Sequence, residues 1–284
     1  MAVVLDGIAY GLQLSLLAVG LTLIYGLGGV LNLAHGQFAV VTALSSAVMM
    51  RAGVPTLVAI TAGVGVGAVL ALAVDASLMR AVYRLEGEAR VLLSILLTIG
   101  LAFVIDGLAI YYHPFTQLNI DVPGPAITLL GVPMRRGSLV ASAVALVALG
   151  ALILFLRYTR RGRAVRSIIE DEEGAQLCGI NPSRIRTLVF GLSGALAGVA
   201  AAAQGLTSSL GSTDGLNLTI LALIVTVVGG LGSVSGALLA GLLLGVVYSL
   251  STFYIGAYIT FVILLASAMA TILVRPSGLL GRGA

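Results

Sequence analysis

Lysine and tryptophan are absent from the sequence, and cysteine occurs once, at Cys178. A single cysteine excludes a disulfide within the chain and any metal site built from several cysteines. Charged residues are also scarce, at 9% of the chain, whereas soluble domains carry roughly 25%. Because a soluble domain needs a charged surface, this shortage excludes a water-soluble globular protein.

Apolar residues take the place of the missing charge. Hydrophobic residues make up 59% of the 284 positions, and the mean hydropathy is +1.14. A water-soluble fold of this length has too little interior for so much apolar surface, so the surrounding solvent must be lipid. The first twenty residues lack the basic start of a cleaved signal peptide, and we expect them to remain as the first membrane span.

Common enzyme motifs are missing as well. The sequence has no H-E-x-x-H metal motif, no G-x-S-x-G nucleophile motif and no Walker A sequence. We therefore predict a protein that is not an enzyme, with no catalytic residues, no metal and no cofactor. One alternative stays open, since Asp75 and Asp106 lie in apolar segments and could form the acid pair of an intramembrane hydrolase.

The apolar runs have the length of membrane-spanning helices, which need about 20 residues each. The alternating polar pattern of a membrane barrel is absent. We therefore predict an all-α, polytopic transmembrane helix bundle of eight or nine spans, with residues 1–284 forming a single domain. The spans lie near 7–26, 33–50, 56–79, 91–112, 138–157, 187–208, 216–230, 234–253 and 257–274. The seventh of these is the shortest.

Arginines mark one side of the predicted bundle. They form three groups: Arg80, Arg84 and Arg90; seven residues from Arg157 to Arg186; and Arg275 with Arg282. Basic residues accumulate on the cytoplasmic side of membranes, and even numbers of spans separate these groups. We therefore predict an external N-terminus and a cytoplasmic C-terminus. The net charge of +4 is then an orientation signal, and no nucleic-acid partner is predicted.

The loop 113–137 falls on the outer side in this topology. Arg135 and Arg136 lie in it, against the positive-inside rule. Its four prolines disfavour a continued helix and predict a short ordered cap on the outer face.

Glycine is abundant, with 37 residues spread along the chain. Small residues three and four apart let helices approach closely in lipid, so we expect a tightly packed and oligomeric bundle. Two acids lie within the spans. Asp75 precedes Arg80 by about one turn, which favours either an ion pair at the membrane surface or snorkelling of the side chain toward it. Asp106 has no basic neighbour and either lines a polar cavity or hydrogen-bonds across helices.

The segment 157–187 is the longest polar stretch. Five arginines come first, followed by the acids Glu170, Asp171, Glu172 and Glu173. The positions of Arg163, Arg166, Glu170 and Glu173 suit one short helix supported by i,i+3 and i,i+4 pairs, which Asn181-Pro182 would stop. The residues alone allow either a solvated loop or a helix that docks onto a cytoplasmic partner.

Part of this segment, GRAVRSIIEDEEGAQLCGINPSRIR, resembles the cytoplasmic loop of permease subunits in ABC importers of the branched-chain amino acid (Liv) type. In that family an E-A-A element, followed after three residues by G, forms a coupling helix that sits in a cleft of the ATPase. Glu173, Gly174, Ala175 and Gly179 reproduce this spacing, with Gly174 in place of the first alanine. The resemblance implies a coupling helix within the loop 158–187, with Glu170, Asp171 and Glu172 beside it.

Three further stretches resemble the same family in the same order. YGLGGVLNLAHGQF is similar to a Y-G-x-x-x-x-x-N-x-A-H-G-x-F pattern, VVGGLGSVSGALLAGLLLG to a glycine-rich signature, and VRPSGLLG to a terminal R-P-x-G-L-x-G. Together with the coupling segment they are distributed in order from near the start of the chain to near its end. The N-x-A-H-G form points to the LivH-like half of the family.

The resemblance implies a set of partners in the bacterial cytoplasmic (inner) membrane. These are a second, LivM-like permease subunit, two cytoplasmic ATPase subunits and an extracytoplasmic solute-binding protein. ATP hydrolysis is then expected on the partners, and the transported solute is a branched-chain or related amino acid. Permeases for urea and short amides also occur in the family, and an ion-coupled secondary transporter or channel is the alternative from another class.

The stretch GLGGVLNLAHGQ, residues 26–37, carries polar side chains between two apolar runs. If it is helical, Gly28, Asn32, His35 and Gly36 share one face and serve helix packing. If the helix is broken, its freed backbone groups need protein or a water-filled cavity, as in the paired helix breaks of transporters. GGLGSVSG, residues 229–236, is then the counterpart. We predict that Gly28, Asn32, His35, Gly36, Gln37 and Asp106 line the translocation path or its gate.

Overall fold

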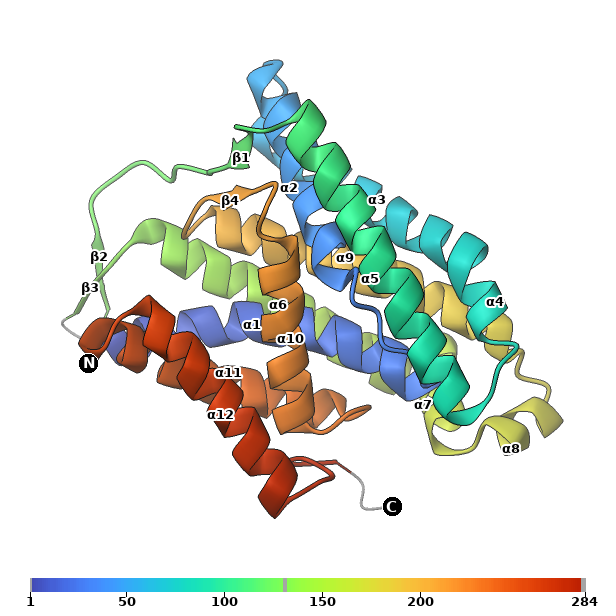
Figure 1. Cartoon of the computed structure of the whole chain (residues 1–284). Helices are drawn as coiled ribbons and strands as arrows, with labels where there is room; N and C mark the ends of the chain where they lie inside the picture. The colour runs from blue at the N-terminus through green and yellow to red at the C-terminus, as the bar shows by residue number, and fades with distance from the viewer. Residues whose placement is uncertain (1, 130–131, 282–284) are drawn as a thin grey trace.

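The computed structural model describes residues 2–129 and 132–281 and shows a bundle of helices (Figure 1). Nine helices in these ranges have 15 or more residues. They are α1 (Ala2–Gly28), α2 (His35–Arg51), α3 (Thr56–Val74), α5 (Gly87–Tyr112), α6 (Arg136–Tyr158), α9 (Pro182–Gly205), α10 (Gly215–Gly229), α11 (Val234–Tyr254) and α12 (Ala257–Val274). The predicted all-α bundle is confirmed.

Seven helical segments within the described ranges are long and apolar enough to cross a membrane. One of them, Thr56–Val82, combines α3 with the π-helix η1 (Asp75–Met79) and α4 (Arg80–Val82). Two predicted spans correspond to shorter helices, because α2 has 17 residues and α10 has 15. The number of complete crossings therefore depends on these two helices and the non-helical segments that precede them.

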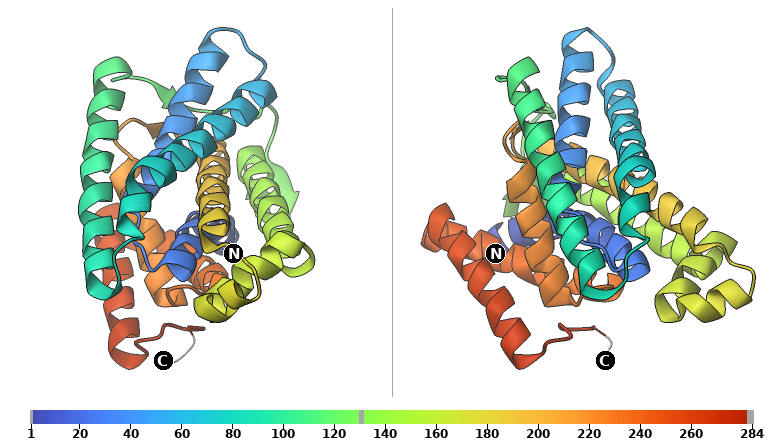
Figure 2. Two further views of the ribbon diagram at one scale, coloured as in Figure 1. Left: turned by 90° about the vertical axis from the view of Figure 1, so that its right-hand side faces the viewer. Right: turned by 45° about the vertical axis from the view of Figure 1, so that its right-hand side comes forward.

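Short strands lie at one end of the bundle and two short helices at the other (Figures 1 and 2). The strands are β1 (Gln117–Leu118), β2 (Ile127–Leu129), β3 (Val132–Met134) and β4 (Leu210–Gly211), with β1 paired to β4 and β2 to β3, both antiparallel. The short helices are α7 (Arg160–Glu170) and α8 (Glu172–Leu177). We call these regions the strand end and the α7/α8 end.

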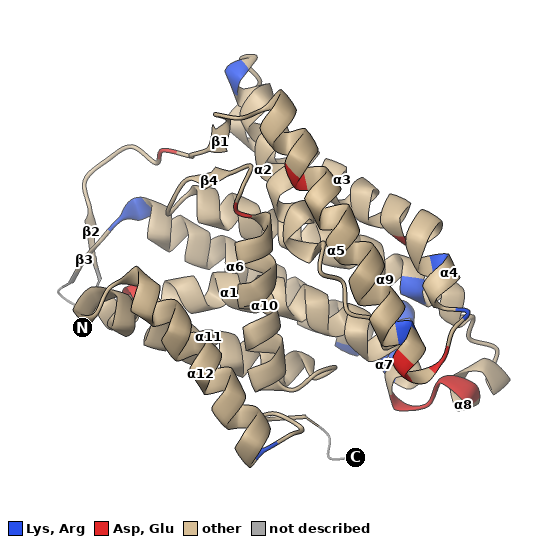
Figure 3. Ribbon diagram, viewed as in Figure 1, with Lys and Arg blue, Asp and Glu red and all other residues tan. Residues whose placement is uncertain are grey.

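Charge is distributed unevenly between the two ends. Figure 3 shows basic and acidic residues gathered around α4, α7 and α8. At the strand end, Arg136 Nε donates to the carbonyl of Pro125 (2.9 Å), and Arg51 Nη1 donates to Thr116 Oγ1 (3.1 Å). Arg51 thus adds a third arginine to the two exceptions noted from the sequence. Arg282 lies outside the described residues, and the orientation in the membrane remains a prediction.

Helix α1 forms the centre of the bundle. The left view of Figure 2 looks nearly along it and shows other helices on several sides. Glycines make its contact with α11 close: a Cβ on Gly245 would lie 2.2 Å from the Cα of Gly11, and one on Gly241 would lie 2.9 Å from the Cα of Ser15. The expectation of close packing through small residues is confirmed at this pair.

The chain leaves the helical conformation between α1 and α2. Gly29 has a φ of +58°, and residues 30–34 are not helical. The amides of Leu31 and Leu33 instead donate to side chains of α5, namely Ser94 Oγ at 3.1 Å and Thr98 Oγ1 at 2.9 Å. The alternative of one continuous helical face through residues 28–36 is therefore wrong, and the broken geometry is the one observed.

Candidate functional site

The N-termini of α2 and α10 meet inside the bundle. The Gly36 amide donates to Thr219 Oγ1 at 2.8 Å, and a Cβ on Gly36 would lie only 2.0 Å from the carbonyl oxygen of Gly215. The two backbones are therefore in direct contact, which no larger residue at position 36 permits. The first amides of α2 have acceptors within the protein, since those of His35 and Gln37 donate to the carbonyls of Asn32 and Ala34. The positive dipole ends of both helices lie at this crossing.

Asn32 shapes the start of α2. Its Oδ1 accepts a hydrogen bond from the Ala34 amide at 3.0 Å, which is a local turn of the kind that Asn side chains favour. The side chain is fully buried, and its Nδ2 has no protein hydrogen-bond partner among the described residues. Asn32 thus holds the turn and keeps one donor available.

His35 braces three helices. Its Nε2 lies 3.1 Å from the carbonyl oxygen of Leu17 on α1, and its Nδ1 lies 3.3 Å from Ser193 Oγ on α9. Because a carbonyl only accepts, the proton belongs on Nε2, and the Ser193 hydroxyl donates to Nδ1. The ring fits over Gly20, where a Cβ would lie 2.9 Å from the ring carbon Cε1. Both ring nitrogens are therefore engaged in holding the structure.

Gln37 differs from His35, because its polar atoms have no partner. The side chain is fully buried, and neither Oε1 nor Nε2 makes a hydrogen bond within the part of the chain that the structure describes. Its amide lies across Gly215, where a Cβ would overlap it. The half-buried carboxyl of Asp106 faces the Gln37 side chain, and its Oδ1 is likewise unpartnered. Gln37 and Asp106 therefore form a polar pair with hydrogen-bonding capacity to spare.

The predicted path residues thus separate into two places. Residues 32–37 and Asp106 lie around the crossing of α2 with α10, whereas Gly28 lies at the α7/α8 end, beside the Tyr83 ring. Asp75 has other neighbours: it is buried in η1 and accepts a hydrogen bond from Thr187 Oγ1 at 2.5 Å. The predicted surface ion pair with Arg80 is not found among the described residues, and Asp75 is buried instead. Asp106 faces Gln37, so the two acids have different neighbours and no acid pair is observed in the part of the chain that the structure describes.

The polar segment after α6 folds as two helices rather than one. Thr159 caps α7 by accepting from the Gly162 amide (2.9 Å), and Asp171 caps α8 by accepting from the Gly174 amide (3.1 Å). Asp171 has an extended backbone, so the expected single helix through Glu170 and Glu173 is wrong. Gly179 turns the chain with a φ of +81°.

Asn181 and Pro182 follow α8 and also form the start of α9. The Asn181 side chain accepts from the Arg184 amide at 3.2 Å, and Pro182 occupies the first turn of α9. This is the usual N-terminal chemistry of a helix. In the sequence, the pair predicts only the end of the preceding helix.

The residues predicted to couple to an ATPase differ in how they are placed on α8. Ala175 is buried against the bundle, and Glu172 turns toward it. Asp171, Glu173 and Gly179 are exposed, as are Gln176 and Cys178. Leu177 is 90% exposed. α8 therefore presents a leucine among acidic and polar residues to its surroundings.

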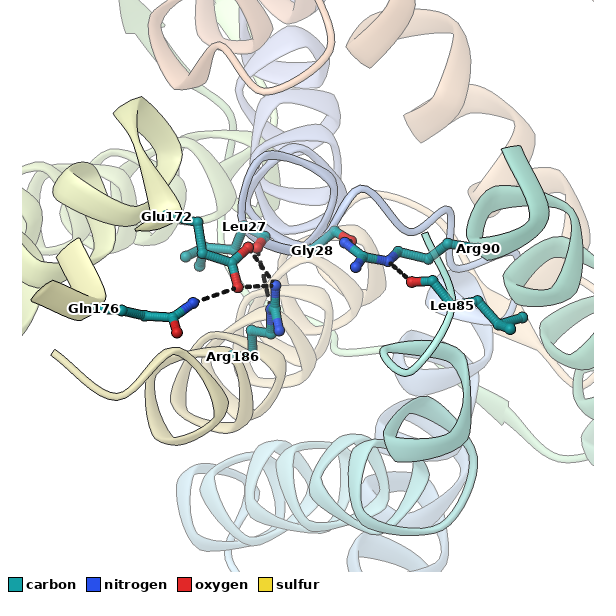
Figure 4. Close-up of polar contacts among 7 residues, drawn as sticks. All are labelled: Leu27, Gly28, Leu85, Arg90, Glu172, Gln176 and Arg186. Carbon is teal, nitrogen blue, oxygen red and sulfur yellow. Dashed lines mark hydrogen bonds and ion pairs between the residues drawn. The ribbon is translucent and has the colours of Figure 1, made fainter. Parts of the chain in front are cut away.

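Arg186 joins α8 to the bundle. From its place in the sequence it is predicted only to help orient the protein in the membrane. Its Nη2 lies 2.6 and 2.7 Å from the two carboxylate oxygens of Glu172 (Figure 4). Its Nε donates to the carbonyl of Leu27 at 3.3 Å, and its guanidinium lies 4.7 Å from the centre of the Tyr83 ring. Burial raises the pKa of the Tyr83 phenol above its ordinary range, so the ring stays neutral beside the cation.

A second arginine holds the neighbouring carbonyl. Arg90 Nη1 donates to the carbonyl of Gly28 at 3.1 Å, while its Nε donates to that of Leu85 at 2.7 Å (Figure 4). The last two residues of α1 are therefore each held by an arginine from another helix.

A groove of about 830 Å³ opens at the α7/α8 end. It lies between α1, α6, α7 and the turn that joins α10 to α11. Its lining includes Tyr25, Gly29, Arg157, Arg166, Ser233 and Leu238. The glycine-rich stretch 229–236 thus approaches residues 26–29, and a Cβ on Gly26 would lie 3.2 Å from the Cα of Gly232. Across the described ranges, no group of three His, Cys, Asp or Glu side chains could hold a metal ion.

A helix bundle with apolar spans, a break inside it and an exposed helix pair at one end defines a multi-pass membrane protein of the transporter class. Residues 3–274 match the family model described as branched-chain amino acid transport system / permease component, and the chain belongs to this family. The resemblance inferred from four short stretches is thereby confirmed.

Relatives agree over nearly the full length. The high-affinity branched-chain amino acid transport system permease protein LivH of Escherichia coli K12 is 31% identical, and BraD of Pseudomonas aeruginosa is 30% identical. Each comparison covers 98% of this chain and 94% of the relative. The solved structure of PsaBC from Streptococcus pneumoniae in complex with Fab has a similar fold, with a TM-score of 0.50, 12% identity, and coverage of 96% of this chain and 91% of the other.

Proposed function

We propose that the protein is the permease subunit of an ATP-driven importer for branched-chain or related amino acids. The observation that carries this proposal is α8, a short helix outside the apolar spans whose Leu177 and Glu173 face outward. In helices that dock into a groove of a partner, outward-facing apolar side chains act as anchors, and Leu177 can serve as one. Family membership supports a partner of the ABC type.

In this proposal the α7/α8 end lies in the cytoplasm of a bacterial cell and the strand end outside the inner membrane. Two ATPase subunits bind the α8 of this chain and its equivalent on a second permease subunit. A solute-binding protein delivers the amino acid at the strand end. The gathering of arginines around α7 and α8 supports this orientation.

The solute would pass near the crossing of α2 with α10. Gln37 and Asp106 support this location, because neither amide atom of Gln37 nor Oδ1 of Asp106 makes a hydrogen bond with the described residues, although these atoms lie inside a membrane protein. Such groups are costly in lipid and mark solute or ion pathways. The zwitterion of an amino acid offers an ammonium group for Asp106 and a carboxylate that can accept from the Gln37 amide.

Docking is tested by co-purification with the ATPase subunits of an importer of this family. Glu173→Arg or Gly179→Trp should abolish their binding, since each alters the exposed face or the turn that presents it. Glu88→Arg is the matched control, because Glu88 is exposed at the same end outside α8. Retained ATPase binding in both Glu173→Arg and Gly179→Trp would contradict the docking role of α8.

The half-buried Asp106, whose Oδ1 has no hydrogen-bond partner among the described residues, supports one second candidate, an ion-coupled transporter. Proteoliposomes with an imposed proton gradient separate the two functions. Leucine uptake that needs ATP and the ATPases supports the importer, whereas uptake by this chain and gradient alone would replace it with the second candidate. Binding of leucine, urea and short amides to the cognate solute-binding protein then identifies the solute class.

A further inference from the structure

Helix α8 depends on one side chain for its position. With six residues it is too short to be stable alone, and Ala175 is its buried residue. Its polar tie to the bundle is the ion pair of Glu172 with Arg186 (Figure 4). Within α8 itself, Gln176 Nε2 donates to Glu172 at 3.5 Å. Arg186 is 9% exposed, so water does not readily replace Glu172 as its partner.

The other side of Arg186 holds the end of α1. Because the chain leaves the helix after Gly28, the carbonyl of Leu27 has no helical amide four residues later. Arg186 Nε supplies the missing donor, and Arg90 does the same for Gly28. A cation at a helix C-terminus is also favoured by the helix dipole. The position of Arg186 therefore helps to fix where α1 ends and the non-helical segment 29–34 begins.

We propose that Arg186 is the positioning residue through which a displacement of α8 reaches the break between α1 and α2. The proposal rests on the proposed function, in which the ATPases move α8. When Glu172 moves with α8, the guanidinium either follows it and pulls on the Leu27 carbonyl, or loses its buried partner. The first response transmits the motion to segment 29–34, which leads directly into His35, Gly36 and Gln37.

Tyr83 gives the guanidinium a surface along which it can shift. The ring lies against Gly28, where a Cβ would lie 2.8 Å from the ring edge, so the same aromatic side chain touches both Arg186 and the end of α1. Lysine cannot replace this arrangement, because it lacks a planar fork that reaches a carboxylate and a carbonyl at once.

The test uses the full complex in proteoliposomes, with ATP hydrolysis and uptake of radiolabelled leucine measured on the same sample. Arg186→Lys, Arg186→Met and Glu172→Gln should retain the ATPases and hydrolyse ATP, while leucine taken up per ATP falls on the order of tenfold. Arg184→Met is the matched control, since Arg184 is an exposed arginine on the same helix, and it should keep the wild-type ratio.

A nitroxide on the native Cys178 reports the position of α8 directly, because this cysteine is exposed at its end. Its spectrum should show greater mobility in Arg186→Met and Glu172→Gln than in wild type or Arg184→Met. A wild-type ratio of uptake to hydrolysis in Arg186→Lys, or unchanged label mobility in Glu172→Gln, would overturn the inference. If Arg186→Met fails to assemble, the Lys and Gln variants still decide the question.

Failure of the proposed importer function and failure of the proposed role of Arg186 give different experimental results. Absence of ATPase binding to the wild-type chain would remove the proposed function itself. Normal binding and normal coupling in the Arg186 variants would remove only the role of Arg186.

Discussion

Single residues in the interior of this protein differ in whether their contacts are complete. His35 has a partner for each ring nitrogen, whereas Gln37, two positions later, has none for either amide atom. Both are fully buried. The same short stretch therefore contains one residue that holds helices together and one whose hydrogen-bonding groups are unused, and the two should respond differently to substitution.

His35→Leu should destabilise the protein. The change leaves Ser193 Oγ without its acceptor inside the bundle and removes a hydrogen bond to α1, at a cost of about 1–3 kcal/mol. Thermal unfolding of the detergent-solubilised chain measures this loss. A variant that melts and transports like wild type would contradict the bracing role.

Gln37→Leu should show the opposite pattern. Replacing an unpaired buried amide by an apolar side chain of similar size leaves the free energy of unfolding unchanged or slightly higher. Leucine uptake should fall in an assembled complex, because the proposed solute path loses the hydrogen-bonding amide of Gln37. The same unfolding assay serves as the control, and normal uptake would place the path elsewhere.

Gly36→Ala tests the contact between backbones. The added methyl group would meet the Gly215 carbonyl, so overpacking should reduce the free energy of unfolding by about 1–3 kcal/mol. Gly100→Ala is the matched control, since a Cβ at that position has no heavy atom within 4 Å. It should be neutral or slightly stabilising because alanine favours the helix. Equal melting temperatures for the two variants would contradict the close crossing.

At the scale of elements, the break between α1 and α2 is the feature that the sequence indicated only as one of two alternatives. Asn32, His35 and their glycines suit either a helix face or a broken helix. The choice depends on Ser94 and Thr98, which lie more than 60 residues later and supply the acceptors for Leu31 and Leu33. No local pattern contains that information, because it arises from the packing of α5.

Thr98→Val removes one of these acceptors without changing the shape of the side chain. The Leu33 amide is then left without its partner, at a cost of about 1–3 kcal/mol if no water replaces it. Hydrogen exchange should become faster in residues 29–34 and stay unchanged in α11. Thr61→Val is the control, since its hydroxyl bonds only to carbonyls of its own helix. Equal exchange in the two variants would contradict the bridging role.

The elements themselves were largely predictable, and the contacts between them were not. Long apolar runs located the helices within a few residues, and the polar stretch near 170 indicated a short helix outside the membrane. The predictions failed where one residue had two possible uses. Asp171 reads as a helical acid but acts as a cap, and Asn181-Pro182 reads as an end but also begins α9. Arg186 could not be singled out, because its partners Glu172, Leu27 and Tyr83 come from three separate segments.

At the scale of the whole molecule, cysteine labelling can test which end of the bundle faces the cytoplasm. Asp121 is exposed at the strand end and Cys178 at the α7/α8 end. In cells that express this chain without the ATPases, a membrane-impermeant maleimide should label Asp121→Cys in a Cys178→Ser background. The native Cys178 should react only in inside-out vesicles. The reverse pattern would invert the proposed orientation.

The central position of α1 has a consequence for biogenesis. It leaves the ribosome before α10 and α11, yet Ser15 donates to the carbonyl of Leu238, 223 residues later, and Thr22 donates to Thr226. During synthesis these hydroxyls must remain within their own helix or against a helper protein, since lipid offers them nothing. Helix α1 is therefore translated well before the two helices that accept or share these hydrogen bonds, and in that interval the nascent chain most needs an insertase or chaperone beside it.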